Sequence, residues 1–306
     1  MNRYGLFLGC NVPAVRPDVE RAIRLSMPRL GAEMVDLEGS VCCPAFGSFP
    51  SADETASLAV SAWNFSIAEV LGVPMVTQCG SCYSSLRMAL DRLHGDEVLR
   101  EKVQGLLRTK SGREFRGTAV VRHITDVLFN DIGPERIRAS LEHPLAGMSA
   151  VVQYPCHTLY PSEVVGFEES SGRPRMLRGL VEALGAEVRP YSRELQCCGG
   201  AGGFVKGSFA GASEYAFRKL RALRAETDAS LIVVSCITCL EHLDRMQAEL
   251  AKRDPAYVPL PVFDYNQLLA VCMGFDPAQV ASISTTPRET VVERIRGAGR
   301  SPAARP

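Results

Sequence analysis

Short apolar runs, most of them rich in β-branched residues, recur along the chain, and several run directly into a cysteine. Runs of this length and composition are typical of strands that are buried on both faces of a sheet. Four of them end on a cysteine: Tyr4 to Cys10, Pro74 to Cys79, Ala150 to Cys156 and Ser230 to Cys236. The first resembles the third and the second resembles the fourth, so the pattern indicates one structural unit used twice.

Helical patterns separate these predicted strands. Pro17 to Leu30 is expected to form a helix, with a proline in its first turn and Gly31 as its stop. Glu33 to Leu37 then reads as a strand. Tyr83 to Leu93 is expected to be helical, and its counterpart Leu240 to Leu250 carries apolar residues along one face.

Each half also closes with a strand that runs into a helix, at residues 120–128 and again at 261–269. Alternation of strands and helices predicts parallel sheets with helices on both faces. We therefore expect an α/β protein of two tandem, pseudo-twofold-related halves, each a parallel-type sheet flanked by helices. The expected boundaries are 1–135 for the first half, 148–275 for the second, and 276–306 for a partly disordered C-terminal tail.

Composition narrows the classes of function. The chain has 306 residues, and its 34 basic and 34 acidic side chains give a formal net charge of zero, so no nucleic-acid partner is expected. The N-terminus does not fit a signal peptide, and no run of 18 uncharged apolar residues could span a membrane. We expect a cytoplasmic protein. In that reducing compartment, eleven cysteines favour metal binding or catalysis over structural disulfides.

The cysteines follow one order twice. The first five are spaced Cys-x31-Cys-Cys-x35-Cys-x2-Cys and the next five Cys-x40-Cys-Cys-x37-Cys-x2-Cys, with Cys272 left over. A recurrence of this length does not arise by chance, and in parallel sheets ligands bind at the carboxyl ends of the strands. We expect each set of five to gather at one sheet edge, whereas Cys272, on an apolar helix, is expected to be a buried free thiol.

Several chemistries compete for these thiols. The two Cys-x2-Cys pairs could form one structural zinc site or act as redox dithiols, but both alternatives leave six cysteines of the repeated pattern unexplained. An iron–sulfur centre in each half uses all ten, since thiolates are the usual cluster ligands. Five thiolates exceed the four of an ordinary cluster, and two adjacent ones suggest a distorted core. The glycines after Cys198 lack the order of a phosphate-binding loop.

With their flanks, these motifs closely resemble the cysteine-rich CCG domain family and, within it, the B subunit of heterodisulfide reductases. The stretches that carry the resemblance are Phe7-Leu8-Gly9-Cys10, Cys42-Cys43-Pro44, Cys79-Gly80-Ser81-Cys82-Tyr83, Tyr154-Pro155-Cys156-His157, Cys197-Cys198-Gly199-Gly200-Ala201-Gly202-Gly203 and Cys236-Ile237-Thr238-Cys239. The resemblance runs from about Tyr4 to Gly274. One departure is the long gap before Cys197, which we expect to be an insertion at Gly166 to Arg175.

The resemblance implies two noncubane [4Fe-4S] clusters, one in each half. Their implied ligands are Cys10, Cys42, Cys43, Cys79 and Cys82 for the first cluster, and Cys156, Cys197, Cys198, Cys236 and Cys239 for the second. Cleavage of a disulfide needs two electrons, and two clusters facing one cavity would each supply one. We therefore expect the two sets to face each other, with His157 and Lys206 as candidate proton donors to the thiolate products.

No flavin or nicotinamide motif is present in the chain. The resemblance implies that electrons come from a C-type subunit with cubane [4Fe-4S] clusters and a flavin-containing A-type subunit. The expected function is that of a catalytic iron–sulfur subunit that reduces or forms a disulfide or persulfide bond. Alternatives are an electron-relay subunit of a hydroxy-acid or other dehydrogenase complex, and a zinc-stabilised interaction module.

Overall fold

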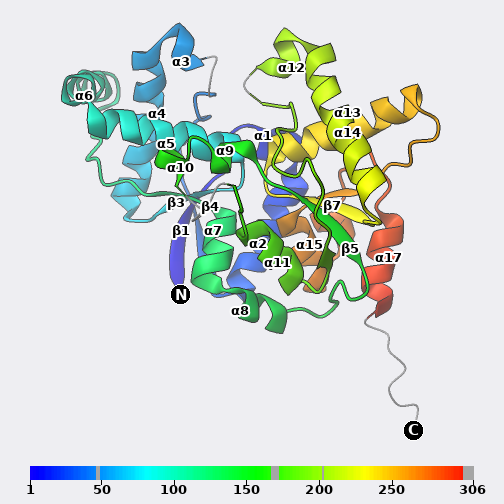
Figure 1. The fold of residues 1–306 in the computed structure, drawn as a ribbon. Coiled ribbons are helices and arrows are strands. Elements are labelled where there is room, and N and C mark those ends of the chain that lie inside the picture. Colours follow the sequence, from blue (N-terminus) through cyan, green and yellow to red (C-terminus); the bar gives the residue numbers. More distant parts are fainter. Residues whose placement is uncertain (46–48, 167–171, 202, 299–306) are drawn as a thin grey trace.

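The computed structural model describes the whole chain except residues 46–48, 167–171, 202 and 299–306. Its framework is a pair of four-stranded sheets in which every strand pairing is parallel (Figure 1). Helices cover both sheets, and the buried apolar side chains of the two halves form one continuous core. The predicted α/β class and the duplicated architecture are therefore confirmed.

The first sheet has the strand order β2-β1-β3-β4. Its strands are β1 (Asn2–Phe7), β2 (Ala32–Asp36), β3 (Met75–Thr77) and β4 (Val121–His123). The helices between them are α1 (Asn11–Val15), α2 (Pro17–Arg29), α3 (Phe49–Ala52), α4 (Glu54–Leu71), α5 (Gly80–Gly95) and α6 (Glu97–Ser111). As expected, α2 has a proline in its first turn and is followed by Gly31 at a positive φ of 76°.

The second sheet repeats this order as β6-β5-β7-β8. Its strands are β5 (Ser149–Gln153), β6 (Glu187–Val188), β7 (Leu231–Val234) and β8 (Val262–Asp264). Its helices are α9 (Cys156–Leu159), α10 (Ser162–Val165), α11 (Met176–Ala183), α12 (Phe204–Gly207), α13 (Phe209–Glu226) and α14 (Ile237–Arg253). Half of the expected insertion at Gly166 to Arg175, residues 167–171, lies outside the described residues.

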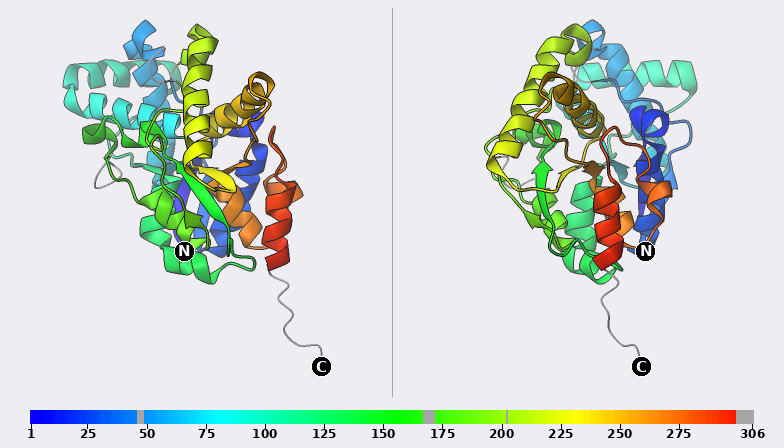
Figure 2. Two further views of the ribbon diagram at one scale, coloured as in Figure 1. Left: turned by 45° about the vertical axis from the view of Figure 1, so that its right-hand side comes forward. Right: turned by 90° about the vertical axis from the view of Figure 1, so that its right-hand side faces the viewer.

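The helices that end each half pack against the other half. After β4 the chain forms α7 (Ile124–Asp126), the π-helical turn η1 (Val127–Ile132) and α8 (Pro134–Ala139), which pack against α11 of the second half. After β8 it forms α15 (Tyr265–Cys272), which packs against α2 of the first half (Figure 2). Near the junction, α5 contacts α9 and α14 contacts α1, so the pseudo-twofold relation extends to the contacts between halves.

Both helices that follow the Cys-x2-Cys motifs begin earlier than predicted. The sequence predicted starts at Tyr83 and Leu240, but α5 begins at Gly80 and α14 at Ile237. The chain passes from strand to helix within a few residues, because the first cysteine of each motif is the extended N-cap residue. The second cysteine of each motif therefore lies in the first helical turn.

Most of the predicted tail at 276–306 has a described structure. Residues 276–298 include α16 (Pro277–Val280) and α17 (Glu289–Ala298), and the side chains of Val291 and Ile295 are buried. These two apolar positions explain why α17 packs against the second half. Residues 299–306 lie outside the described part of the chain. None of the described helices combines the length and the apolar character needed to cross a membrane.

Candidate metal centre

All ten cysteines of the repeated pattern lie at the carboxyl ends of parallel strands. Cys10 and Cys79 follow β1 and β3, and Cys156 and Cys236 follow β5 and β7. The adjacent pairs lie in the loops after β2 and β6. Because parallel strands end at the same edge of their sheet, cysteines far apart in sequence are brought together there.

The first five cysteines form one connected group. The Cys43 Sγ lies 3.1 Å from the Cys82 Sγ. Hydrogen bonds with Cys42 and then Cys82 lower the pKa of Cys43 to about 5. A hydrogen bond with Cys43, burial, and a hydrogen bond with Cys10 raise the pKa of Cys42. Cys79 hydrogen-bonds with Cys82, so the contacts run in the order 10, 42, 43, 82, 79.

The second five repeat this arrangement. The Cys239 Sγ lies 3.3 Å from the Cys198 Sγ. Hydrogen bonds with Cys156 and then Cys198 lower the pKa of Cys197 to about 2. Hydrogen bonds with Cys198 and then Cys236 raise the pKa of Cys239. The contacts therefore run in the order 156, 197, 198, 239, 236, which is the order of the first set.

The two sets meet at a single pair of thiols. The Cys79 Sγ lies 3.8 Å from the Cys236 Sγ, and both residues are N-caps of the helices that contact across the junction, α5 and α14. The Thr238 Oγ1 also lies 3.8 Å from the Cys79 Sγ. The pseudo-twofold axis therefore passes beside the first cysteine of each Cys-x2-Cys motif.

Glycines let the backbone approach the thiols closely. A Cβ on Gly9, where φ is +63°, would lie 2.8 Å from the Cys82 Sγ. In the second half, the Gly199 N lies 3.2 Å from the Cys197 Sγ and the Gly200 N lies 3.4 Å from the Cys198 Sγ. Backbone N–H groups that point at sulfur stabilise thiolate charge.

A cavity of about 570 Å³ opens onto the first set, and all five of its cysteines line the wall. The opposite wall comes from the second half and includes His157, Lys206, Thr238, Glu241 and Arg245. The second set lines an adjoining cavity of only about 10 Å³. The two sets therefore differ in access, although their internal contacts are alike.

The two candidate proton donors lie on the second-half wall of the larger cavity. His157, on α9, is half-buried and lines both cavities. Burial lowers its pKa, so the neutral imidazole predominates at pH 7. Lys206, on α12, is exposed. The leftover Cys272 is buried within α15, where burial raises its pKa to about 12.

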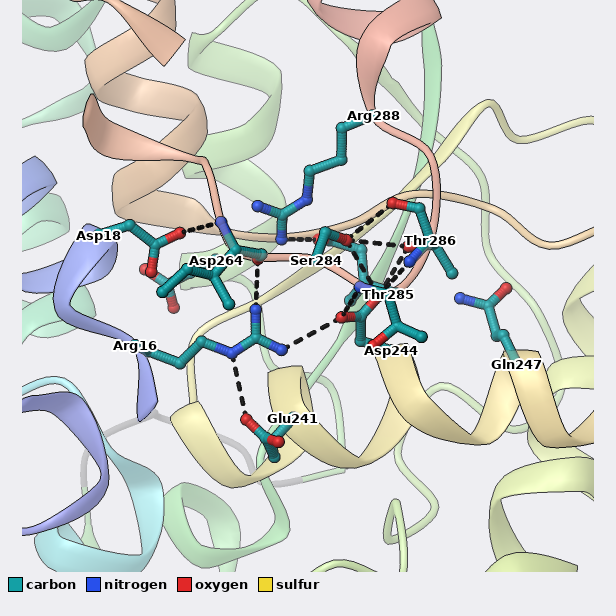
Figure 3. A network of polar contacts seen from close by, with 12 residues as sticks. Arg16, Asp18, Glu241, Asp244, Gln247, Asp264, Ser284, Thr285, Thr286 and Arg288 are labelled. Atoms are coloured by element: carbon teal, nitrogen blue, oxygen red, sulfur yellow. Dashed lines mark hydrogen bonds and ion pairs between the residues drawn. The ribbon is translucent and has the colours of Figure 1, made fainter. Parts of the chain in front are cut away.

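The sequence did not predict the buried ion pair that joins the halves. Arg16 of the first half lies 3.1 Å from Asp244 and 3.2 Å from Glu241, both on α14 of the second half (Figure 3). Asp244 also accepts hydrogen bonds from Ser284 Oγ, Thr285 N, Thr286 N and Thr286 Oγ1. Glu241 lines the larger cavity. No local pattern could have revealed a pair whose members are 228 positions apart.

A second buried network involves Gln78, which directly precedes Cys79. The Gln78 side chain donates a hydrogen bond to Asp264, at the end of β8. The backbone carbonyl oxygen of Gln78 lies 3.1 Å from the Nε2 of His123, at the end of β4. Burial raises the pKa of Asp264 to about 7 and lowers the pKa of His123 to about 4. Both side chains are therefore held in or near their uncharged forms.

The thiol groups are not arranged as ligands of one ion. Within the described part of the chain, no three His, Cys, Asp or Glu side chains converge on a single metal position. Nor do the cysteines form disulfides, since all eleven are free. Five ionised thiolates in one group would repel each other, so the donor chemistry suits an extended cationic core that several sulfurs share.

Comparisons with known proteins agree with this arrangement. The CCG cysteine-rich domain model matches residues 4–87 and 150–244. A protein of Archaeoglobus profundus, named as similar to the B subunit of heterodisulfide reductase, is 40% identical over 96% of this chain and 98% of its own length. The B subunit of a ferredoxin/F(420)H(2)-dependent CoB-CoM heterodisulfide reductase of Methanosarcina acetivorans is 34% identical over 92% of each chain.

A more distant relative is named for a different reaction. It is the 8-methylmenaquinol:fumarate reductase membrane anchor subunit of Wolinella succinogenes, which is 28% identical over 89% of this chain and 92% of its own length. The two cysteine-rich matches coincide with the two halves that carry the five-cysteine groups. The chain therefore belongs to the cysteine-rich CCG domain family, among the proteins that are similar to the B subunit of heterodisulfide reductases.

Proposed function

We propose that this chain is the catalytic iron–sulfur subunit of a heterodisulfide reductase-like oxidoreductase complex. In this proposal, each five-cysteine set holds one noncubane [4Fe-4S] cluster. The observation that carries the proposal is the presence of two separate groups of five thiols that adjoin at Cys79 and Cys236. The names of the relatives that cover nearly the whole chain support the same class of complex.

The surroundings of the thiols suit a cluster in each half. Gly9 leaves room against Cys82, and the N–H groups of Gly199 and Gly200 point at the sulfurs of the adjacent pair. The Asn64 Nδ2, buried beside the loop that contains Cys42, has no hydrogen-bond partner among the described residues. Such N–H donors are suited to sulfur acceptors and offset the negative charge of a cluster.

The proposed reaction converts a disulfide, two electrons and two protons into two thiols, or the reverse. When bound, each cluster supplies or accepts one electron. The protein's own part is to admit the sulfur–sulfur bond to the larger cavity, which the first set lines and which adjoins the second set. The wall from the second half excludes bulk water from one side of this space and provides polar groups that orient the substrate.

Two side chains are proposed to handle the protons. His157 lines both cavities and is the nearest imidazole by sequence to a second-set cysteine. Burial lowers the pKa of His157, so its ring is neutral and can relay a proton. Lys206, at the cavity wall, is proposed as the source of that proton. In His157→Gln we expect the pH profile of turnover to change. An unaltered profile would remove His157 from this role.

We propose that other proteins supply the electrons. The partners would be a C-type subunit with cubane [4Fe-4S] clusters and a flavin-containing A-type subunit, in a cytoplasmic complex. A second candidate function, an electron-relay subunit without its own substrate, is favoured by the relative that is named for fumarate reduction. The two candidates differ in whether a small disulfide enters the cavity.

The proposal is tested by electron paramagnetic resonance on protein purified without oxygen. Signals are recorded with and without heterodisulfides or the corresponding thiols, in the wild-type chain and in Cys272→Ala. A new cluster signal that depends on the thiol, and that Cys272→Ala retains, is expected for the catalytic subunit. Cluster signals that respond to no thiol or disulfide would favour the relay, and a chain with zinc and no iron would exclude both candidates.

A further inference from the structure

A lysine is completely buried against the loop that leads into the adjacent cysteine pair of the second set. Lys219, on α13, has a relative exposure of 0%. Its Nζ lies 3.2 Å from the hydroxyl of Tyr191 and 3.3 Å from the carbonyl oxygen of Glu194, and it also donates to the carbonyl of Arg193. These acceptors belong to the loop that leads into Cys197. The ammonium group is therefore fixed against the segment that presents the adjacent cysteine pair.

This ammonium lies in the electrostatic field of the second set. Burial lowers the pKa of Lys219 to about 8, and negative charge on Cys198, Cys239 and Cys197 acts in the opposite direction. The charged form therefore predominates at pH 7. The carboxylate of Glu194 also acts on this lysine. That carboxylate lies 3.3 Å from the guanidinium of Arg178, so its negative charge is neutralised by the arginine and does not neutralise Lys219.

The first half has a neutral residue in the corresponding place. Lys219 stands 22 residues after Cys197, and Asn64 stands 22 residues after Cys42. Both lie buried on corresponding helices, α13 and α4. The Asn64 Oδ1 accepts a hydrogen bond of 2.8 Å from the N of Val41, which directly precedes the cysteine pair. Each side chain therefore supports the loop before the adjacent cysteine pair of its own half, but only the one in the second half carries a charge.

We infer that Lys219 is a tuning residue that raises the reduction potential of the second cluster site and so makes two structurally similar sites electronically unequal. The inference rests on the proposed function, because it requires a cluster in each half. Reduction adds one negative charge at a site, and a nearby buried cation stabilises that charge with little screening by water or salt. Net charge near a cluster is one of the determinants of its potential.

Because the two sites differ in reduction potential, they accept the two electrons in a fixed order. A single electron that the partner subunit delivers to this chain would reside at the second site, behind the cavity that admits the substrate. The more open first set would receive an electron only afterwards. Unequal sites therefore keep the pair of electrons from arriving in random order at the sulfur–sulfur bond.

The test is a redox titration followed by electron paramagnetic resonance on the oxygen-free, cluster-loaded chain. The signal of the second site is identified by its loss in Cys198→Ala. Lys219→Gln keeps hydrogen-bond donors but removes the charge, Lys219→Arg keeps the charge, and Lys252→Gln removes one charge from the exposed end of α14. Asn64→Lys places a charge in the first half.

In Lys219→Gln we expect the reduction equilibrium of the second site to fall about tenfold, which is about 59 mV for one electron. The first site should not move, and Lys219→Arg and Lys252→Gln should retain the wild-type potentials. Unmoved potentials in Lys219→Gln, or equal shifts at both sites, would overturn the inference alone. If this variant fails to assemble, Asn64→Lys decides, since a raised first potential supports the inference and an unchanged one overturns it. A wild-type chain without clusters overturns the proposed function as well.

Discussion

Removal of the Arg16 side chain tests how the two halves are held together. The Arg16 and Asp244 side chains are 3% and 0% exposed, and Arg16 also pairs with Glu241 and donates to the carbonyl of Ile283. Loss of one partner from a buried ion pair typically costs about 3–5 kcal/mol, because the other charge stays buried without compensation. Four hydrogen bonds from residues 284–286 remain on Asp244, so the lower end of that range applies.

For Arg16→Met we therefore expect the free energy of unfolding to fall by about 3 kcal/mol. The assay is urea unfolding followed by circular dichroism, with the same metal content in every sample. A double-mutant cycle with Asp244→Asn should give a coupling energy of about 1–3 kcal/mol. The matched control is Arg138→Met, whose pair with Glu135 is 53% and 87% exposed and should contribute less than about 1 kcal/mol.

The same pair predicts a dependence on pH. Burial acts to raise the pKa of Asp244, but hydrogen bonds from Thr285 and Thr286 and the pairing with Arg16 hold it below its usual value. This stabilisation is present above the unfolded pKa of about 4 and is lost as the pH falls through the folded value. A loss in Arg16→Met no larger than in Arg138→Met, with no coupling to Asp244, would refute the reasoning.

Three further predictions concern the cysteine sets and their support. Gly9→Ala should lower the iron content of the first set, because the new Cβ would lie 2.8 Å from the Cys82 Sγ, whereas Gly105→Ala, with no atom within 4 Å, should leave the content unchanged; equal iron in both variants would contradict this. Cys272→Ala should retain full iron and lose only packing energy, since the thiol is buried in α15 away from both sets; a loss of iron would make it a ligand. Burial raises the pKa of Asp264 to about 7, so the folded chain binds an extra proton between about pH 4 and 7. The free energy of unfolding should therefore decline as the pH rises through that window, and Asp264→Asn should remove this part of the slope; an unchanged slope would contradict the assigned direction.

The sequence predicted the sheets and the gathering of cysteines for a clear physical reason. Apolar β-branched runs such as Ser230 to Cys236 have few alternatives to a buried strand, and parallel strands place their ends at one edge. The helix starts at Gly80 and Ile237 were missed because the residues between the cysteines of each motif, a glycine and a serine or an isoleucine and a threonine, are weak helix formers. Their helical geometry comes from the strand-to-helix turn and is not visible in a periodic pattern.

Contacts between the halves could not be predicted. The apolar composition of α15 indicates that it is buried, but it does not show that the partner is α2 of the other half. Charged residues such as Arg16 and Lys219 read as surface positions, since lysine and arginine are rarely buried. Only a comparison of equivalent positions in the two halves, such as Asn64 against Lys219, marks the buried lysine as unusual.

We propose that the ten cysteines hold two separate inorganic cores. Chemical analysis of iron and acid-labile sulfide in the oxygen-free chain tests it most directly, in the wild type and in Cys43→Ala and Cys198→Ala. We predict roughly eight iron and eight sulfide per wild-type chain, four for each [4Fe-4S] core, and roughly half of each in either variant. One zinc per chain, or iron that is lost completely when either cysteine is replaced, would contradict two independent five-cysteine sites.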